Sequence, residues 1–127
     1  DGRIVAAAHN RVEAEKSVVC HAEIEVLRQL EALRNDWRMD GITLYVTKEP
    51  CPMCAGALVN ARVDEIVFGA KDLAFGGCGG AVDIPGMEKA LHHPRVVGGV
   101  AEEAAAQLLR DFFRLRRKEK NSSPQKS

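Results

Sequence analysis

The order of segments in the middle of the chain constrains the fold most. Residues 42–47, "ITLYVT", are rich in β-branched and aromatic residues and predict a strand. Residues 64–70, "DEIVFGA", predict a second strand, and "CPMCAGALVNAR" between them predicts a short helix over residues 51–62 with Pro52 in its first turn. Strands that alternate with helices indicate an α/β sandwich.

Two longer segments flank this unit. Apolar residues at helical spacing predict a helix from about Val18 to Leu33. Residues 71–94 hold many glycines and predict a long loop, with a short helix around Met87 to Leu91. Residues 95–100, "RVVGGV", predict a weaker strand.

The two ends of the chain differ in character. The opening dipeptide Asp1-Gly2 favours a tight hairpin turn, so we expect a strand of the natural protein to precede it, although a frayed end would look the same. Residues 101–120 predict a helix with acids at its start and bases at its end. Residues 121–127, "NSSPQKS", predict a disordered tail, so the domain would span residues 1–120.

Length and composition exclude several classes of protein. With 127 residues, of which 46% are hydrophobic, the chain is long enough for one globular domain with its own core. Four cysteines in 127 residues fall well below the cysteine density of disulfide-rich secreted domains, so a reducing, cytoplasmic setting is favoured. The sequence contains no run of about 18 apolar residues, which is what a membrane-spanning helix would need.

Cys51 and Cys54, three residues apart, admit three interpretations: a redox pair, two metal ligands, or two small apolar residues. A catalytic zinc site usually takes three protein ligands and leaves the fourth position to water. His21, in "CHAE" at the head of the first predicted helix, is the candidate third ligand. Both helix starts can meet at the carboxyl ends of parallel strands, and helix N-termini stabilise the thiolates that bind zinc.

Glu23 follows His21 by two positions. Side chains two apart in a regular helix face different ways, so the two can converge only if His21 is the N-cap, where the backbone is not yet helical. A carboxylate beside a metal site can carry protons to and from a reacting group. The alternative is that Glu23 merely favours the helix dipole in the first turn.

These residues resemble a known signature. His-x-Glu followed, after 26 intervening residues, by Pro-Cys-x-x-Cys resembles the zinc-dependent cytidine and nucleobase deaminases. Within that superfamily, "LYVTKEPCPMCAGAL", "VFGAKD" and "DFFRLRR" most resemble the bacterial-type tRNA adenosine deaminases, which make inosine at the wobble position of the anticodon. The likeness runs from Ile4 to about Lys118.

The resemblance implies a fold and a set of site residues. The fold would be a three-layer α/β/α cytidine-deaminase-like sandwich with a mixed central sheet, whose first helix and first strand are absent from this chain. His21, Cys51 and Cys54 would bind Zn²⁺, and Glu23 would be the general acid and base. The implied substrate contacts are Asn10, the main chain at Ala22 and Pro50, Asp72, Phe113, Arg114 and Arg116.

The resemblance also implies a tRNA anticodon loop as partner, a homodimer and no membrane association. Residues 110–127 carry a net charge of +5 and residues 1–109 a net charge of −5. A basic end on an acidic body indicates a polyanionic partner, although a solvated helix end would have the same composition. Two other functions stay open: deamination of a free base or nucleoside such as guanine, cytosine or cytidine, and binding of zinc and RNA without turnover.

The sequence departs from the family pattern at three places. "SVVC" replaces the polar residues that usually precede the His-Ala-Glu motif, and Lys48 stands where an apolar residue is common. Cys78 lies in an unusual glycine-rich segment, and together with Cys20 it is expected to be structural rather than a ligand. His92 and His93 are expected to be ordinary loop residues.

Overall fold

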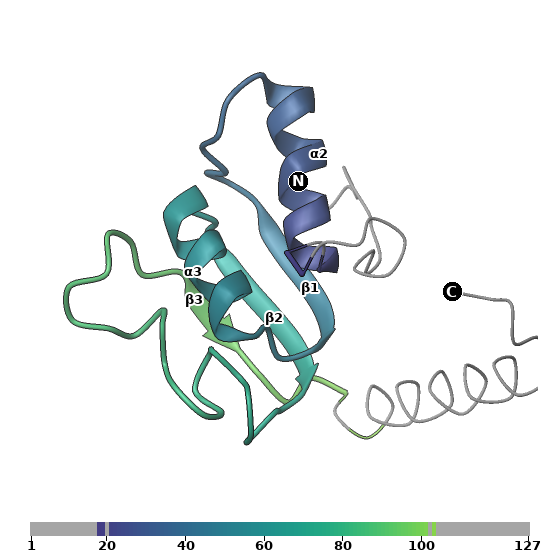
Figure 1. The fold of residues 1–127 in the computed structure, drawn as a ribbon, viewed down its shortest axis with the longest axis vertical. Helices are drawn as coiled ribbons and strands as arrows, with labels where there is room; N and C mark the ends of the chain where they lie inside the picture. The colour runs from purple at the N-terminus through teal and green to yellow at the C-terminus, as the bar shows by residue number, and fades with distance from the viewer. Residues whose placement is uncertain (1–17, 20, 102, 104–127) are drawn as a thin grey trace, which may run out of the picture.

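The computed structural model describes residues 18, 19, 21–101 and 103 (Figure 1). Its elements are helix α2 (Ala22–Arg34), strand β1 (Thr43–Lys48), helix α3 (Pro52–Ala61), strand β2 (Glu65–Ala70) and strand β3 (Arg95–Val97). The predictions for the hairpin turn at residues 1–2, the tail at residues 121–127 and nearly all of the helix at residues 101–120 lie outside the described residues.

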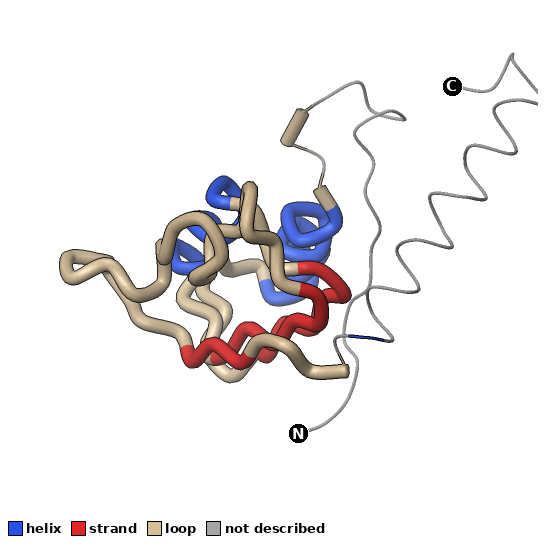
Figure 2. The backbone as a smooth tube through the Cα atoms, turned by 90° about the horizontal axis from the view of Figure 1, so that it is seen from below, coloured by secondary structure: helices blue, strands red, loops and turns tan. Residues whose placement is uncertain are grey.

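The three strands form a parallel sheet in the order β1-β2-β3. Thr43 pairs with Glu65 at one end of β1, Lys48 pairs with Ala70 at the other, and α3 connects the two strands. Both helices lie on the same face of this sheet (Figure 2). This arrangement confirms an α/β protein, whereas the antiparallel strand and second helical layer of the expected sandwich involve residues outside the described ranges.

Helix α2 begins later than predicted. His21 is its N-cap with an extended backbone (φ −72°, ψ 155°), so Val18 and Val19 are exposed residues before the helix rather than its first turn. Glu23 and Glu25 place negative charge in the first turn, where the helix dipole favours it. The helix ends at Arg34 and is capped by Asn35, whose left-handed conformation (φ 53°) is common after the last helical residue.

Helix α3 agrees with the prediction to within a residue at each end. Cys51 is its N-cap (φ −70°, ψ 170°) and Pro52 is its first residue, where the missing N–H costs nothing. Arg62 ends it in a left-handed conformation (φ 63°). None of the helices in the described part of the chain is long and apolar enough to cross a membrane.

The core lies between the two helices and the sheet. Leu27 and Leu30 of α2 are buried in it, while Leu33, near the end of the same helix, is 70% exposed. Burial of these side chains fixes the helices against the sheet, so both helix N-termini lie near the carboxyl end of β1. The buried cluster comprises Leu27, Leu30, Met39, Leu44, Ala55, Leu58, Ala61, Val63, Ile66, Phe68 and Cys78.

The prediction of a short helix around residues 87–91 is wrong. The segment forms two successive tight turns, in which the N–H of Met87 donates to the carbonyl of Ile84 (3.2 Å) and the N–H of Ala90 donates to the carbonyl of Met87 (3.0 Å). Fixing the first helical turn is unfavourable, and so short a segment gains too few further hydrogen bonds to offset it.

His92 and His93 attach the second half of this loop to the rest of the protein. The Nε2 atom of His92 lies 2.7 Å from the carbonyl oxygen of Val63, and the Nδ1 atom of His93 lies 2.8 Å from the carbonyl oxygen of Pro85. Both rings therefore bind main-chain carbonyls, which agrees with the expectation that they are ordinary loop residues.

Candidate metal centre

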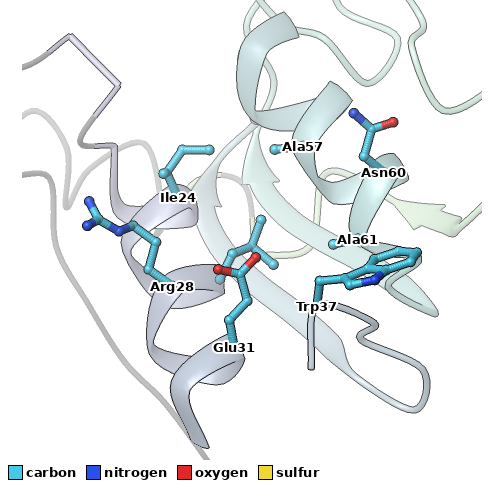
Figure 3. A pocket seen from close by; sticks show the side chains of 8 residues that line it. Ile24, Arg28, Glu31, Trp37, Ala57, Asn60 and Ala61 are labelled. Atoms are coloured by element: carbon cyan, nitrogen blue, oxygen red, sulfur yellow. The ribbon is translucent and has the colours of Figure 1, made fainter. Parts of the chain in front are cut away.

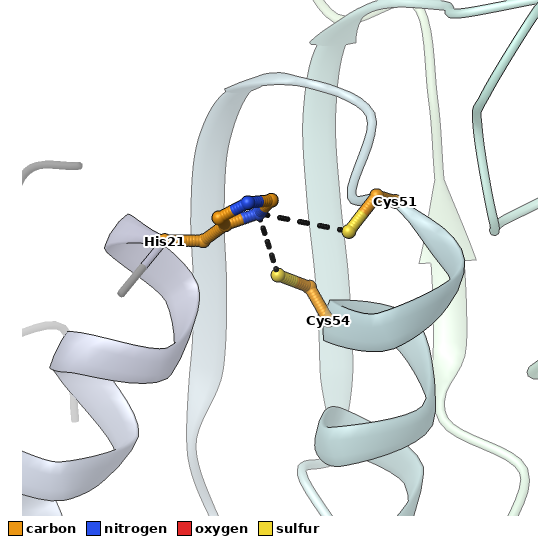
Figure 4. A group of neighbouring side chains, drawn as sticks. All are labelled: His21, Cys51 and Cys54. Atoms are coloured by element: carbon orange, nitrogen blue, oxygen red, sulfur yellow. Dashed lines mark hydrogen bonds between the residues drawn. The ribbon is translucent and has the colours of Figure 1, made fainter. Parts of the chain in front are cut away.

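His21, Cys51 and Cys54 converge at the starts of α2 and α3, as Figure 4 shows. The sulfur of Cys51 lies 3.6 Å from Nδ1 of His21, and the sulfur of Cys54 lies 3.5 Å from the same atom. All three potential ligand atoms lie within 4.8 Å of one another. The residues that the sequence singled out as a ligand set are therefore brought together.

Local backbone structure explains this convergence. His21 and Cys51 are both N-cap residues with extended backbones, so each side chain lies at the positive end of a helix. The extended backbone of His21 confirms the prediction that it stands at a cap. Cys54 lies one turn into α3 and so shares a helix face with Cys51.

The separations between these atoms fit a tetrahedral zinc ion. Zinc–sulfur bonds of about 2.3 Å and zinc–nitrogen bonds of about 2.0–2.1 Å at tetrahedral angles place sulfur and nitrogen about 3.5 Å apart. The two observed sulfur–nitrogen distances of 3.6 Å and 3.5 Å match this value. One imidazole and two thiols also match the donor set of catalytic zinc sites that leave a fourth position open.

A positive charge beside the two cysteines would stabilise their thiolate forms. Burial raises the pKa of the Cys54 thiol, and the negative charges of Glu23 and Cys51 raise it further. A thiol in such surroundings keeps its proton unless a cation stands beside it, and a bound divalent cation reverses this preference. The two helix N-termini favour the thiolates in the same sense.

Glu23 lies in the first turn of α2 and is partly buried. After burial, its negative charge is the next cause of the raised pKa of Cys54, and Glu23 is two positions from the ligand candidate His21. This position suits a group that exchanges protons with a substrate beside the cluster, and the catalytic role of Glu23 stays a prediction.

Ala22 and Pro50, two further predicted substrate contacts, each adjoin a residue of the ligand cluster in sequence. Ala22 is the first residue of α2, so its N–H lacks a partner within the helix. Pro50 is fully buried and its carbonyl accepts a hydrogen bond from the N–H of Gly77 (2.7 Å). One lone pair of the carbonyl oxygen is therefore used, and the other can accept a second hydrogen bond.

Asp72 serves the structure of its own loop. One carboxylate oxygen accepts the N–H groups of Ala74 (3.1 Å) and Phe75 (3.0 Å), and the other lies 3.2 Å from Nζ of Lys48. The unusual lysine at position 48 thus forms an ion pair at the end of β1. The predicted contact of Asp72 with RNA stays a prediction.

The other predicted contacts, Asn10, Phe113, Arg114 and Arg116, lie outside the described residues, as does Cys20. Cys78 is buried and belongs to the hydrophobic core rather than to the ligand cluster. Burial raises its pKa to about 12, and the negative charge of Glu49 adds to this shift. It is a structural thiol, as expected.

Glu49 is a buried carboxylate, only 4% exposed, that sequence reasoning passed over. It follows Lys48, which is exposed, and precedes Pro50. An acidic residue just after a predicted strand is common at the protein surface, so its burial could not be predicted. The only signal in the sequence is indirect, because the glycine-rich segment 76–80 brings backbone N–H groups close to it. Pattern reasoning does not connect two segments so far apart in the chain.

A separate groove runs between α2 and α3 (Figure 3). Its volume is about 360 Å³, and Trp37, which is 49% exposed, forms one wall. It lies further along both helices than the ligand cluster and is not the candidate active site. The lining residues are Ile24, Leu27, Arg28, Glu31, Trp37, Ala57, Asn60 and Ala61.

The sequence model of the MafB19-like deaminase family matches residues 1–117. A tRNA-specific adenosine deaminase from Bacillus subtilis is 45% identical over 124 residues, which cover 97% of this chain and 76% of the relative. Another tRNA-specific adenosine deaminase, from Agrobacterium fabrum, is 42% identical over 118 residues, which cover 92% of this chain and 77% of the relative.

Solved structures agree with the sequence comparisons. A structure from a study of A-to-I editing by tRNA:A34 deaminases is 37% identical and superposes with a TM-score of 0.81, covering 84% of this chain and 78% of the other. A guanine deaminase from Nitrosomonas europaea is 28% identical, with a TM-score of 0.67 and coverage of 85% and 64%. These likenesses confirm the predicted cytidine-deaminase-like α/β fold.

Proposed function

Because this chain belongs to the MafB19-like deaminases and, among them, to the tRNA-specific adenosine deaminases, we propose that it converts adenosine to inosine at the wobble position of a tRNA. The reaction is hydrolytic: water adds its oxygen to C6 of the base, and the C6 amine leaves as ammonia. The observation that carries the proposal is the cluster of His21, Cys51 and Cys54 with Glu23 beside it.

His21, Cys51 and Cys54 would hold zinc through one imidazole nitrogen and two thiolates. Zinc in such a site lowers the pKa of water from about 15.7 to about 7 and so supplies a nucleophile at neutral pH. The helix N-termini at His21 and Cys51 stabilise the two thiolates and keep the ligand atoms in place.

Glu23 moves the protons of the reaction. Its carboxylate takes a proton from the attacking water, gives it to N1 of the adenine ring, and then transfers the second water proton to the leaving amine. The overall change is one water consumed and one ammonia released per inosine formed, so Glu23 ends each cycle in its starting state.

Two main-chain groups orient the base. The N–H of Ala22, which has no partner within α2, would donate to the reacting end of the base, and the second lone pair of the Pro50 carbonyl would accept from the amine. One group lies in the first turn of α2 and the other just before the α3 N-cap, so both would orient the base from helix starts.

We further propose the partners and setting of the enzyme. Asn10, Asp72, Phe113, Arg114 and Arg116 contact the nucleoside and the anticodon loop, and two copies of the chain form a homodimer. The enzyme works in the cytoplasm, where tRNA is processed and thiols stay reduced. Light scattering on the purified protein tests the dimer, with a mass of one chain as the contrary result.

The activity is tested by incubating the purified protein with tRNA that carries adenosine at the wobble position and, in parallel, with free guanine, cytosine and cytidine. We expect inosine in the tRNA and ammonia release from that reaction alone. Release from free guanine with tRNA untouched would instead favour the small-molecule deaminase that the second structural relative represents. Zinc binding without any turnover would favour a noncatalytic RNA-binding role.

The metal is tested separately by elemental analysis of protein purified without added metal. We expect one zinc per chain. A disulfide between Cys51 and Cys54 in metal-free protein would contradict the proposed site and favour a redox pair.

A further inference from the structure

Glu49 has no part in the chemistry proposed above, yet it is the one buried charged or polar side chain among the described residues. It follows the last residue of β1 and stands two positions before the ligand Cys51. A buried carboxylate is costly unless it is hydrogen-bonded, so its partners indicate what it does.

Three backbone N–H groups of the following loop donate to this carboxylate. One oxygen accepts the N–H of Asp72 (3.0 Å), and the other accepts the N–H groups of Cys78 (2.9 Å) and Gly80 (2.7 Å). Hydrogen bonds to an ionised carboxylate are stronger than those between neutral groups. Glu49 thus gathers residues 72–80 around a single point.

Glycines make this close approach possible. A Cβ atom at Gly76 would collide with the carboxylate of Glu49, and one at Gly80 would collide with the carbonyl of Asp72 and lie 2.6 Å from Glu49 Oε1. The loop therefore encloses the carboxylate only because these positions lack side chains.

The same loop packs against the turn that presents Cys51. The N–H of Gly77 donates to the carbonyl of Pro50 (2.7 Å). A Cβ atom at Gly77 would lie 2.7 Å from Cα of Pro52 and 2.8 Å from the carbonyl carbon and oxygen of Cys51, so the two backbones are in direct contact. Interactions that keep the loop in this position therefore also restrict the backbone of residues 50–52.

We propose that Glu49 is a positioning residue of the metal centre: its carboxylate holds residues 72–80 against residues 50–52 and so fixes the direction of the Cys51 side chain. This inference rests on the proposed metal binding. Without the carboxylate, three buried N–H groups lose their acceptor, the loop moves away, and the turn that carries Cys51 gains freedom.

The test compares Glu49→Gln with Asp83→Asn. Glutamine keeps the shape of Glu49 but turns one acceptor oxygen into a donor that faces an N–H group. Asp83→Asn is the matched control, because its carboxylate also accepts an N–H within residues 71–94, that of Gly86 (3.1 Å), but forms no side-chain hydrogen bond with residues 50–52 in the described part of the chain. Each variant is measured for zinc affinity by chelator competition, for the Co²⁺–thiolate absorption of the cobalt-loaded protein, and for thermal stability.

We expect Glu49→Gln to lower zinc affinity by about 10–100-fold, the range typical of groups that orient metal ligands, and to shift the Co²⁺–thiolate bands. The control should change neither. A purely structural role would lower the melting temperature while leaving the affinity and the spectrum of the folded protein unchanged, and that result would overturn the proposal.

Glu49→Asp decides the question if Glu49→Gln does not fold. Aspartate keeps the charge but is shorter by one methylene, so it reaches fewer of the three N–H groups. Reduced affinity with shifted cobalt bands supports the proposal, and wild-type values for both contradict it. If wild-type protein does not bind zinc, the proposed function itself is contradicted. If wild type and both Glu49 variants bind zinc equally well, only the role of Glu49 is contradicted.

Discussion

Glu23 occupies the first turn of α2, where its carboxylate is close enough to Cys54 to raise the pKa of that thiol after burial has done so. It is an acid that no metal ligation requires. In the proposed function, metal binding depends on His21 and the two cysteines while proton transfer depends on Glu23, so a substitution at Glu23 should separate these two properties of the site.

Glu23→Gln should keep one zinc per chain and lose turnover on tRNA by about 10²–10⁴-fold, because the amide cannot exchange protons with the substrate. Metal content and initial rates measured on the same preparation test this. Glu31→Gln, an exposed position on the same helix, is the control and should stay active. Activity of Glu23→Gln within a few-fold of wild type would contradict the role.

Gly77 and Gly56 give opposite expectations for the same substitution. Gly77→Ala forces a methyl group against the backbone of Cys51 and Pro52 and should destabilise the protein by about 1–3 kcal/mol. Gly56→Ala adds a methyl group in open space within α3 and should stabilise it by about 0.5–1 kcal/mol. Urea unfolding of both variants tests this, and equal effects would refute the packing argument.

The helices and strands could be read from the sequence to different degrees. The bounds of α3 and β2 followed from Pro52, the apolar spacing and the β-branched run, because these signals are local. The start of α2 did not, since Val18 and Val19 extend the apolar pattern but stand exposed before the cap. The ligand set could be predicted because two cysteines three apart and a histidine at a helix start match the donors of a catalytic zinc site, whereas the hydrogen bonds of Glu49 join distant segments without any periodic signal.

The turn at the start of the long loop should respond to pH through Asp72. The N–H of Phe75 lowers the pKa of this carboxyl most; partial burial opposes the shift, and Lys48 and the N–H of Ala74 lower the pKa further. Because the folded-state pKa is depressed, the stabilisation is complete above the unfolded value of about 3.9, declines as the pH falls below it, and is gone below the folded-state pKa.

Asp72→Asn should therefore be less stable than wild type at neutral pH, and the difference should disappear in acid. Urea unfolding at a series of pH values measures this difference. Asp40→Asn, at an exposed position, is the control and should show no such trend. A difference between wild type and Asp72→Asn that stays constant across the series would argue against an ionised Asp72 as its source.

Charge is distributed unevenly over the molecule, with a net +5 in residues 110–127 and a net −5 in residues 1–109. An enzyme that acts on tRNA must bind a polyanion and take one nucleotide out of its stack, whereas an enzyme for a free base needs neither. Substitutions of the basic residues near the end of the chain should therefore affect an RNA substrate but not a free base.

Replacing Arg114, Arg116 and Arg117 together with glutamine should weaken tRNA deamination strongly while zinc content and folding are retained. Each lost phosphate contact should reduce the salt dependence of binding by a slope of about 0.7. Neutralising Arg28, Arg34 and Arg38, which are exposed on and after α2, removes the same charge elsewhere and is the control. Undiminished activity of the first triple variant would favour a small-molecule substrate.

The parallel sheet has a consequence for the order of folding. Residues 43–70 form β1, α3 and β2 from contacts close together in the chain, whereas β3 joins only after the whole of residues 71–94 has been closed into a loop. Loop closure must precede the contacts that reward it, so the local unit forms first. A newly made chain would thus hold Cys51 and Cys54 at the start of a formed helix before the loop that carries Gly77 has packed against residues 50–52.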